Sequence, residues 1–266
     1  MSRFKAFAIH FGISLIIFSV LLYFILVQWY PEPLFSSDGG WTVIRIIAGV
    51  DLVLGPLLTL IIYKTGKPGL KFDLTMIALF QTLALTWGIW TTYNERPAAI
   101  IYSVDFFTPV PAYQLKEQGI DENELKKYGN EWPILIYSDI PKDKEQEAFI
   151  NAYKTGKAVY LLKEYYTKFS PEISAELKND SMNLEKYVKD KPKLLKLYQQ
   201  ALQENQNINN VSYLALHSRE GWVTAVFDLD TMRIIDTIDI EPSAYTNAEE
   251  IKVIDKEGKT RTIRAK

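Results

Sequence analysis

The sequence predicts a membrane protein in which a bundle of three transmembrane helices is followed by an α+β extracytoplasmic domain with a small, mainly antiparallel sheet. Two observations lead to this prediction. Three long apolar segments lie near the N-terminus of the 266-residue chain, and most of the charged residues follow them. The mean hydropathy of −0.06 therefore averages a lipid-facing third of the chain and a water-facing remainder.

The membrane domain is predicted over residues 1–96, with spans at about 6–29, 41–63 and 74–93. Each span is long enough for the roughly 20 residues with which a helix crosses the hydrocarbon core. The first span contains no Asp, Glu, Lys or Arg, and it ends in aromatic residues. It is also longer than the apolar region of a signal peptide, so we expect an uncleaved anchor.

Lysine and arginine residues flank the spans unevenly. Arg3 and Lys5 precede the first span, and the loop between the second and third spans contains Lys64, Lys67 and Lys71. The loop between the first and second spans contains none. Because such residues favour the cytoplasmic side, the sequence predicts a cytoplasmic N-terminus and a C-terminal domain on the opposite side of the membrane, which is the periplasm in a Gram-negative cell.

Polar residues lie at membrane depth in the second and third spans. Counting 1.5 Å per residue from the second loop places Asp51 near the middle of the bilayer and Gln81 at an overlapping depth. We therefore expect Asp51 to bond Gln81, or Ser14 of the first span. Arg45 lies near the start of its span, where its long side chain can reach the headgroups. Arg45 and Asp51 are six residues apart, so they should not share a helix face.

Gly55 and Pro56 are expected to kink the second span, because proline removes a helical hydrogen bond. Gly49 and Gly55 would permit close helix approach. Two roles stay open for the polar and helix-breaking residues of the spans, namely Arg45, Asp51, Gly55, Pro56 and Gln81. They either lock and anchor the bundle or recognise another transmembrane helix. A proton or ion path is less favoured, because the three spans contain a single deep carboxylate.

The extracytoplasmic domain is predicted over residues 97–242. It begins with a β-branched and aromatic strand at 99–110, and short helices and a second strand at 132–141 follow. Residues 142–168 have the pattern of a helix with a break near Gly156.

The second half of this domain is predicted to start with a helix that is capped by Ser170 and begins at Pro171. A longer helical segment with a break at Pro192 follows. Residues 207–240 then predict three short antiparallel strands. The polar tail at 243–266 is either a hairpin or disordered.

The composition argues against several classes of function. With no cysteine and two histidines, the chain lacks the residues for thiol catalysis, a disulfide scaffold or a thiolate zinc site. A net charge of −2 argues against nucleic-acid binding by bulk electrostatics. The sequence contains no phosphate-binding, dinucleotide-binding or zinc-protease motif. We therefore predict no catalytic, cofactor-binding or metal-binding residues, and no enzyme.

Three features that look like catalytic or ligand sites have simpler interpretations. His217 is predicted as an ordinary strand histidine. Asp228 and Asp230 are predicted to cap a hairpin turn, although such a pair also occurs as the metal-binding pair of transferases. An aromatic stripe is predicted to cover the core, and it consists of Tyr160, Tyr165, Tyr166 and Phe169.

Four motifs follow one another in the first part of the chain. The N-terminal motif is S-R-F-K-A-F-A-I-H-F-G-I-S at 2–14, and the second span contains G-V-D-L-V-L-G-P-L-L-T-L-I at 49–61. W-x-x-x-x-E-R-P-A follows at 90–98, and I-Y-S-V-D-F-F at 101–107. With these motifs the chain resembles the TfpX/TfpZ-type type IV pilin accessory protein family over about residues 1–110.

This resemblance implies a chaperone-like inner-membrane protein that supports pilin stability and pilus assembly, with type IV pilin and other pilus assembly proteins as partners. We expect the bundle to contact the pilin helix and the periplasmic domain to contact the pilin head. The resemblance also implies a pilin glutamate near the periplasmic face, at a depth similar to that of Arg45, so an Arg45–glutamate contact is a hypothesis. The alternatives are a membrane-bound pilin-modifying transferase and, less favoured, a sensor or channel subunit.

Overall fold

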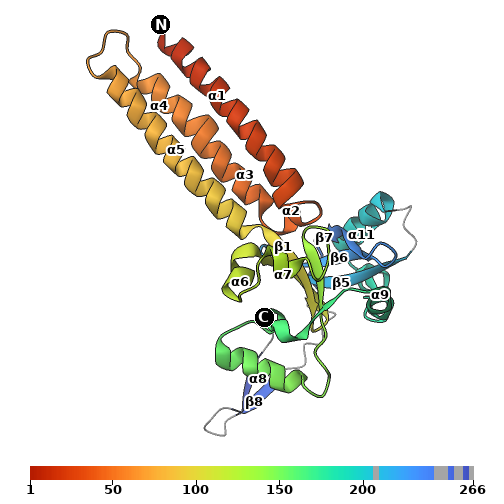
Figure 1. Ribbon diagram of the computed structural model, residues 1–266. Coiled ribbons are helices and arrows are strands. Elements are labelled where there is room, and N and C mark those ends of the chain that lie inside the picture. The colour runs from red at the N-terminus through yellow and green to blue at the C-terminus, as the bar shows by residue number, and fades with distance from the viewer. Residues whose placement is uncertain (206–209, 243–250, 255–259, 264–266) are drawn as a thin grey trace. The chain divides into compact units, whose positions relative to one another are not determined.

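The computed structural model describes residues 1–205, 210–242, 251–254 and 260–263 (Figure 1). Its contacts divide the chain into two compact units. Unit 1 comprises Met1–Val104 and Thr108–Phe169, and unit 2 comprises Asp105–Phe107 and the described part of Ser170–Lys266. The three apolar helices and the first part of the sheet domain therefore belong to the same unit.

Three long apolar helices form the N-terminal part of unit 1, as predicted, and lie side by side (Figure 1). The first consists of α1 (Arg3–Tyr23) and the π-helix η1 (Phe24–Trp29). The second consists of α3 (Gly40–Ala48), the π-helix η2 (Gly49–Leu54) and α4 (Gly55–Ile62), and the third is α5 (Leu70–Glu95). The short α2 (Leu34–Ser37) lies in the first loop.

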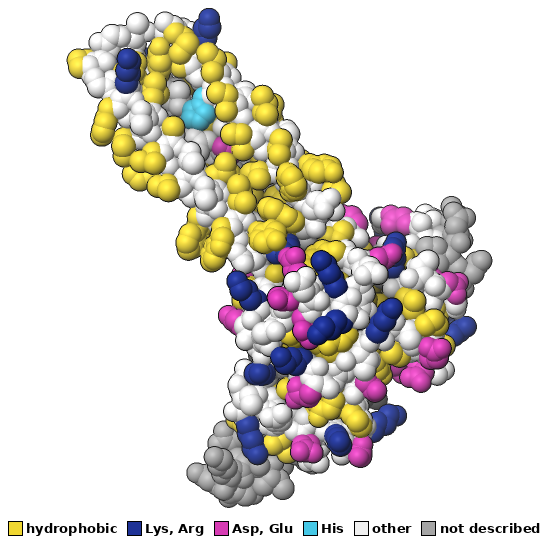
Figure 2. Space-filling view, in the orientation of Figure 1, with side chains coloured by type: hydrophobic (Ala, Val, Ile, Leu, Met, Phe, Trp, Pro, Cys, Tyr) yellow, Lys and Arg dark blue, Asp and Glu magenta, His cyan; other side chains and the backbone are white. Residues whose placement is uncertain are grey.

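The outer surface of these helices is apolar. Many of their large hydrophobic side chains are exposed, including Ile16, Ile61 and Phe80. Figure 2 shows hydrophobic side chains crowded over the helices, whereas lysine, arginine, aspartate and glutamate gather on the rest of the visible surface. Exposed apolar surface on this scale is costly in water and is satisfied by lipid. The helices therefore have the length and the surface of membrane spans.

The rest of unit 1 is an α/β arrangement, and a single residue, Arg96, separates its first strand from α5. Its strands are β1 (Pro97–Ser103), β3 (Ile134–Ser138) and β4 (Tyr166–Lys168), together with most of β2 (Phe106–Pro111). Its helices are α6 (Ala112–Glu117), α7 (Glu122–Leu125), α8 (Glu145–Thr155), η3 (Val159–Leu161) and η4 (Lys163–Tyr165). β1 is buried along its whole length, as expected for a central strand with apolar side chains on both faces.

Unit 2 is built on an antiparallel meander. Its strands are β5 (Val211–Ser218), β6 (Gly221–Asp228) and β7 (Arg233–Ile238), and Phe106 and Phe107 of β2 pair with β5 in parallel. Its helices are α9 (Pro171–Leu177), α10 (Leu184–Val188) and α11 (Pro192–Glu204). In the tail, β8 (Ile251–Ile254) and β9 (Thr260–Ile263) pair antiparallel. The other residues of the predicted tail lie outside the described part of the chain.

The predicted fold class is confirmed, but the sheet is larger and more mixed than predicted. Seven strands follow the order β4-β3-β1-β2-β5-β6-β7, and β2 contributes to both units. The pairs β1–β3 and β2–β5 are parallel, and β3–β4, β5–β6 and β6–β7 are antiparallel. The parallel β1–β3 pair arises because the chain passes through α6 and α7 before it returns as β3, which is the crossover that parallel strands require.

The prediction of a single strand over 99–110 is wrong, because a tight turn divides it. Val104 and Asp105 have positive φ angles of 50° and 66°, which correspond to a two-residue hairpin turn between β1 and β2. A β-branched residue rarely adopts this conformation, so Val104 conceals the turn in the sequence. The predicted helix breaks are confirmed: α8 ends before the left-handed Gly156, and α11 begins at Pro192. The predicted helix over 142–168 does not resume after Gly156, however, because the short turns η3 and η4 and the strand β4 follow.

Candidate functional site

A cluster of polar side chains lies inside the otherwise apolar bundle. The polar cluster consists of His10, Ser14, Asp51, Thr59 and Gln81. His10 and Ser14 are four residues apart on α1 and therefore share one face of that helix. Asp51 in η2 and Thr59 in α4 face them from the second helix, and Gln81 reaches them from α5. All three membrane helices thus contribute to one hydrogen-bonded group.

Gln81 is the centre of the polar cluster. Its amide Nε2 donates to Oδ1 of Asp51 at 2.5 Å and contacts the Ser14 hydroxyl at 3.3 Å, and Ser14 in turn donates to the same Asp51 oxygen at 3.2 Å. Its Oε1 accepts from His10 Nε2 at 2.9 Å. A neutral imidazole that donates through Nε2 accepts through Nδ1, and the Thr59 hydroxyl lies 2.6 Å from that nitrogen. The expected bonds from Asp51 to Gln81 and Ser14 are confirmed.

One oxygen of this cluster has no hydrogen-bond partner. Asp51 is 1% exposed, and its Oδ2 is buried without a partner among the described residues. Asp51 is one of the residues that line a cavity of about 370 Å³. Buried polar atoms in folded proteins are nearly always paired, so this oxygen indicates a missing contact. The remaining lining of the cavity is mostly apolar and comes from α1, α5 and the residues Met1 and Tyr63.

Gly55 and Pro56 shape the helix beneath the polar cluster. A Cβ atom at Gly55 would lie 2.2 Å from Oε1 of Gln81, so any side chain at this position would displace that amide from its hydrogen-bonded position. A Cβ atom at Gly49, by contrast, would have no atom of the described structure within 4 Å. The prediction that Gly49 permits the close approach of another helix is therefore wrong. The helix accommodates Pro56 with the π-helical turn η2, which contains Asp51. Such turns widen the helix locally and often occur at functional sites.

Arg45 is not part of the polar cluster. It lies two residues before the buried Ile47, so its side chain points away from the row formed by Ile47, Asp51 and Gly55. Arg45 is exposed, and its side chain makes no hydrogen bond or ion pair with the described residues. The structure therefore brings Asp51, Gly55 and Gln81 together and leaves Arg45 on another face of the second helix.

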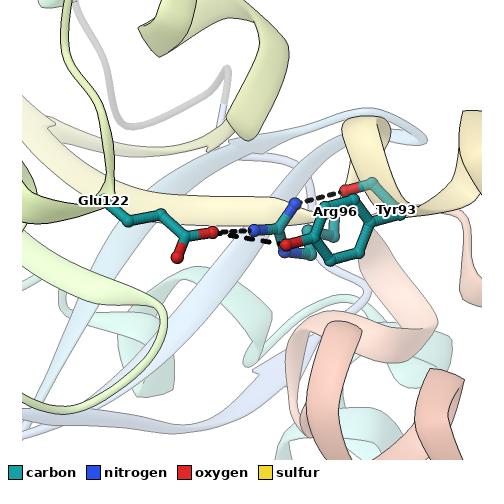
Figure 3. Close-up of polar contacts among 3 residues, drawn as sticks. All are labelled: Tyr93, Arg96 and Glu122. Carbon is teal, nitrogen blue, oxygen red and sulfur yellow. Dashed lines mark hydrogen bonds and ion pairs between the residues drawn. The ribbon is translucent and has the colours of Figure 1, made fainter.

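A second polar feature, which was not predicted from the sequence, lies where α5 meets the sheet. The Arg96 guanidinium donates to the Tyr93 carbonyl and to Oε1 of Glu122, with a nitrogen–oxygen distance of 2.5 Å in each case (Figure 3). It also lies over the Tyr93 ring at 3.7 Å and near the Trp132 ring at 5.5 Å. The Arg96 side chain is 6% exposed, whereas that of Glu122 is 57% exposed. We call these four residues the junction cluster.

The junction cluster borders a cavity of about 230 Å³ that Gln28 and Trp29 also line. Residues at the end of the first span, at the end of α5 and at the start of the sheet therefore converge on one buried guanidinium. This arrangement attaches the α/β part of unit 1 to its helices. The sequence feature that could have indicated a role for Arg96 is the motif E-R-P-A at 95–98, which places this arginine between a membrane helix and a strand.

Comparison with known proteins connects the chain to one group. It is 34% identical over 104 residues to the "Fimbrial assembly protein, serogroups C1 and C2" of Dichelobacter nodosus, a match that covers 38% of this chain and 79% of that protein. The chain belongs to the fimbrial assembly protein family. Two further members from Dichelobacter nodosus, of serogroups I and E1, are 34% and 33% identical over 104 residues, and the match spans 40% of each. Searches found no matching family model and no matching solved structure.

The other candidates in this fimbrial assembly family member lie in unit 2. His217 is in β5, where its ring stacks on Trp222 with centroids 4.5 Å apart and burial lowers its pKa. Asp228 accepts from the Asp230 N–H at 3.0 Å and from the Thr231 hydroxyl at 2.7 Å, as expected for a capped turn. Neither arrangement contains a nucleophile–base pair. Among the described residues, no group of three or more His, Cys, Asp or Glu residues is placed to hold a metal ion.

The Asp228 turn predicts a specific response to acid. Burial acts to raise the pKa of Asp228, but hydrogen bonds from Thr231 and Asp230 outweigh it and lower the pKa. A carboxyl with a lowered folded-state pKa stabilises the fold above its unfolded pKa of about 3.9, and this contribution is lost as the pH falls through the folded value. Thr231→Val should therefore cost about 1 kcal/mol at pH 7 and reduce the acid dependence.

Hydrogen exchange of β6 and β7 at pH 6 and pH 3, corrected for the intrinsic exchange rate, measures this effect. Wild-type protein should lose more protection than the Thr231→Val variant between the two pH values. Equal losses would show that the turn does not stabilise the Asp228 carboxylate.

Proposed function

We propose that this chain is an inner-membrane accessory protein of the TfpX/TfpZ type that supports type IV pilus assembly by binding pilin. The observation that carries the proposal is its 34% identity to a fimbrial assembly protein over 79% of that protein's length. The resemblance of its N-terminal motifs to the pilin accessory family supports the type IV assignment. In this proposal the chain holds pilin in a chaperone-like way and carries out no catalytic step on it.

The construction of the bundle supports a binding role within the membrane. A single apolar helix is sufficient to anchor a domain, whereas this chain has three and places five hydrogen-bonding side chains between them. Polar residues within a membrane bundle are costly and usually functional. A pilin that is itself anchored by an apolar helix would meet the bundle with that helix and the extracytoplasmic domain with its head.

The orientation in this proposal follows from the charges around the spans. The N-terminus and the loop with Lys64, Lys67 and Lys71 face the cytoplasm, and the residues after α5 form a periplasmic domain. This places the junction cluster at the periplasmic end of the bundle, where Trp29, Tyr93 and Trp132 suit the membrane interface.

Crosslinking within living cells tests the function. Photoreactive residues at Tyr153 in α8 and Leu202 in α11 occupy exposed positions in units 1 and 2. We expect crosslinks to pilin from at least one of them, loss of surface pili on deletion of the gene, and recovery on complementation. Normal piliation in the deletion strain, with no pilin crosslink from either position, would contradict the proposal.

Arg45 is the candidate for a charged contact with the pilin helix. It is exposed on the second helix and has no partner among the described residues, so a carboxylate on a neighbouring helix would stabilise it. The Arg45 pairing predicts that Arg45→Leu lowers the pilin crosslink from Tyr153 or Leu202 several-fold, and that Arg45→Lys retains part of it. If Arg45→Leu keeps normal crosslinking and piliation at normal protein levels, the pairing is wrong, although the proposed function stands.

A further inference from the structure

The cavity beside Asp51 lies in a groove between α1 and α5. Both helices pack against the second helix, which forms the floor of the groove and carries Asp51 and Thr59. One wall consists of Ile9, Ile13 and Ile17, spaced by four residues along α1. The opposite wall is on α5 and consists of Leu74, Ala78, Thr82 and Leu85. The groove therefore has mainly apolar walls over about three helical turns and a polar floor.

One oxygen in the floor of the groove, Oδ2 of Asp51, has no hydrogen-bond partner among the described residues. Oδ1 of Asp51 is fully used, because Ser14 and Gln81 both donate to it. Asp51 lines the cavity, and its Oδ2 is buried and has no partner among the described residues. In water such an oxygen would be hydrated, but lipid chains offer no hydrogen bond. The occupant of the groove must therefore supply a polar group at this depth.

The depth of Asp51 restricts what that group is. Asp51 precedes Lys64 by thirteen residues, or about 20 Å along a helix, and the hydrocarbon core is about 30 Å thick. The ester groups of a lipid lie at the edge of this core and do not reach its middle. A transmembrane helix uses its own backbone groups internally, so the contact must come from a side chain. Serine, threonine, asparagine and glutamine carry groups that both donate and accept.

We propose that the groove between α1 and α5 receives the transmembrane helix of pilin and that a hydroxyl or amide side chain of that helix hydrogen-bonds to Oδ2 of Asp51, an inference that rests on the function proposed above. The groove lies on a different face of the second helix from Arg45. The contact with pilin is therefore assigned to the Asp51 face and does not need the Arg45 pairing.

Site-specific photocrosslinking of the full-length chain in pilin-producing cells tests the groove. Ile13 is 54% exposed on its wall, and Ile46, 63% exposed outside the groove, is the matched control. We expect a pilin crosslink from position 13 that is at least fivefold stronger than that from position 46. Asp51→Leu should lower the crosslink from position 13 at least fivefold, whereas Asp51→Asn should retain most of it, because the amide keeps the hydrogen-bonding capacity.

A second variant tests the groove even if the Asp51 variants misfold. Ile13→Trp fills the groove from an exposed position that makes no hydrogen bond, and it should abolish the pilin crosslink from Ala78 on the opposite wall. Two results would contradict the binding of pilin in the groove. One is a pilin crosslink from Ala78 that persists in the Ile13→Trp variant, and the other is a pilin crosslink from Ile46 without one from Ile13. If pilin crosslinks at Tyr153 or Leu202 persist in either case, the proposed function survives. If no position yields pilin, both proposals fail.

Discussion

Replacing Arg96 by leucine is expected to loosen the attachment of the sheet to the membrane helices by about 2–3 kcal/mol. The guanidinium is 6% exposed, and its loss removes the bonds to the Tyr93 carbonyl and Glu122 together with the contacts to two aromatic rings. Losing a charged hydrogen-bond donor and its cation–π contacts has a cost of this order. The estimate is below the 3–5 kcal/mol typical of a broken buried pair, because Glu122 is 57% exposed and stays solvated.

Hydrogen exchange of β1, which begins one residue after Arg96, measures this effect. A loss of 2–3 kcal/mol corresponds to exchange that is roughly 30- to 150-fold faster. Arg96→Lys should fall between wild type and Arg96→Leu, because lysine keeps the charge but not the planar fork. Lys127→Leu is the matched control, since it breaks an exposed pair with Glu124 in the same unit. If Arg96→Leu exchanges no faster than Lys127→Leu, the junction cluster does not hold the sheet in place.

The membrane helices were predictable because each is specified by a long local run of apolar residues. The hydrogen bonds from Asp51 to Gln81 and Ser14 were also accessible, because depth along a helix follows from counting residues. His10 and Thr59 were missed as members of the polar cluster, because a single histidine or threonine in a span has no local signature. The four-residue spacing of His10 from Ser14 was the only signal.

The order and direction of the strands in the sheet were harder to predict from the sequence than the strands themselves. β3 was recognised as a strand, but its parallel pairing with β1 depends on where the chain returns after α6 and α7. The junction cluster was missed for a similar reason, since Arg96 meets Glu122 and Trp132 only after the chain has folded back. By contrast, the Asp228 turn was predicted correctly because its hydrogen bonds join residues two or three positions apart.

Replacing Gly55 by alanine is expected to destabilise the bundle by about 1–3 kcal/mol, while the same change at Gly49 should be neutral or slightly stabilising. The new Cβ at position 55 would lie 2.2 Å from Oε1 and 2.5 Å from Cδ of Gln81. The amide is the flexible end of its side chain, so it can move, but moving it breaks its bonds to Asp51 and His10. The cost is therefore that of unpaired buried polar groups rather than of steric overlap. At Gly49 no atom of the described structure lies within 4 Å of the Cβ position, and alanine favours helix.

A double-mutant cycle separates this explanation from a general intolerance of alanine at position 55. Gln81→Ala removes the amide, so adding Gly55→Ala to it should cost much less than Gly55→Ala costs alone, with a coupling of about 1–2 kcal/mol. Unfolding of the purified protein in mixed micelles gives the four free energies of unfolding. Additive effects would mean that Gly55 is required for its backbone conformation and not for the position of Gln81. Strong coupling, with Gly49→Ala unchanged, would establish that Gly55 is small so that Gln81 can hold Asp51 in the floor of the groove.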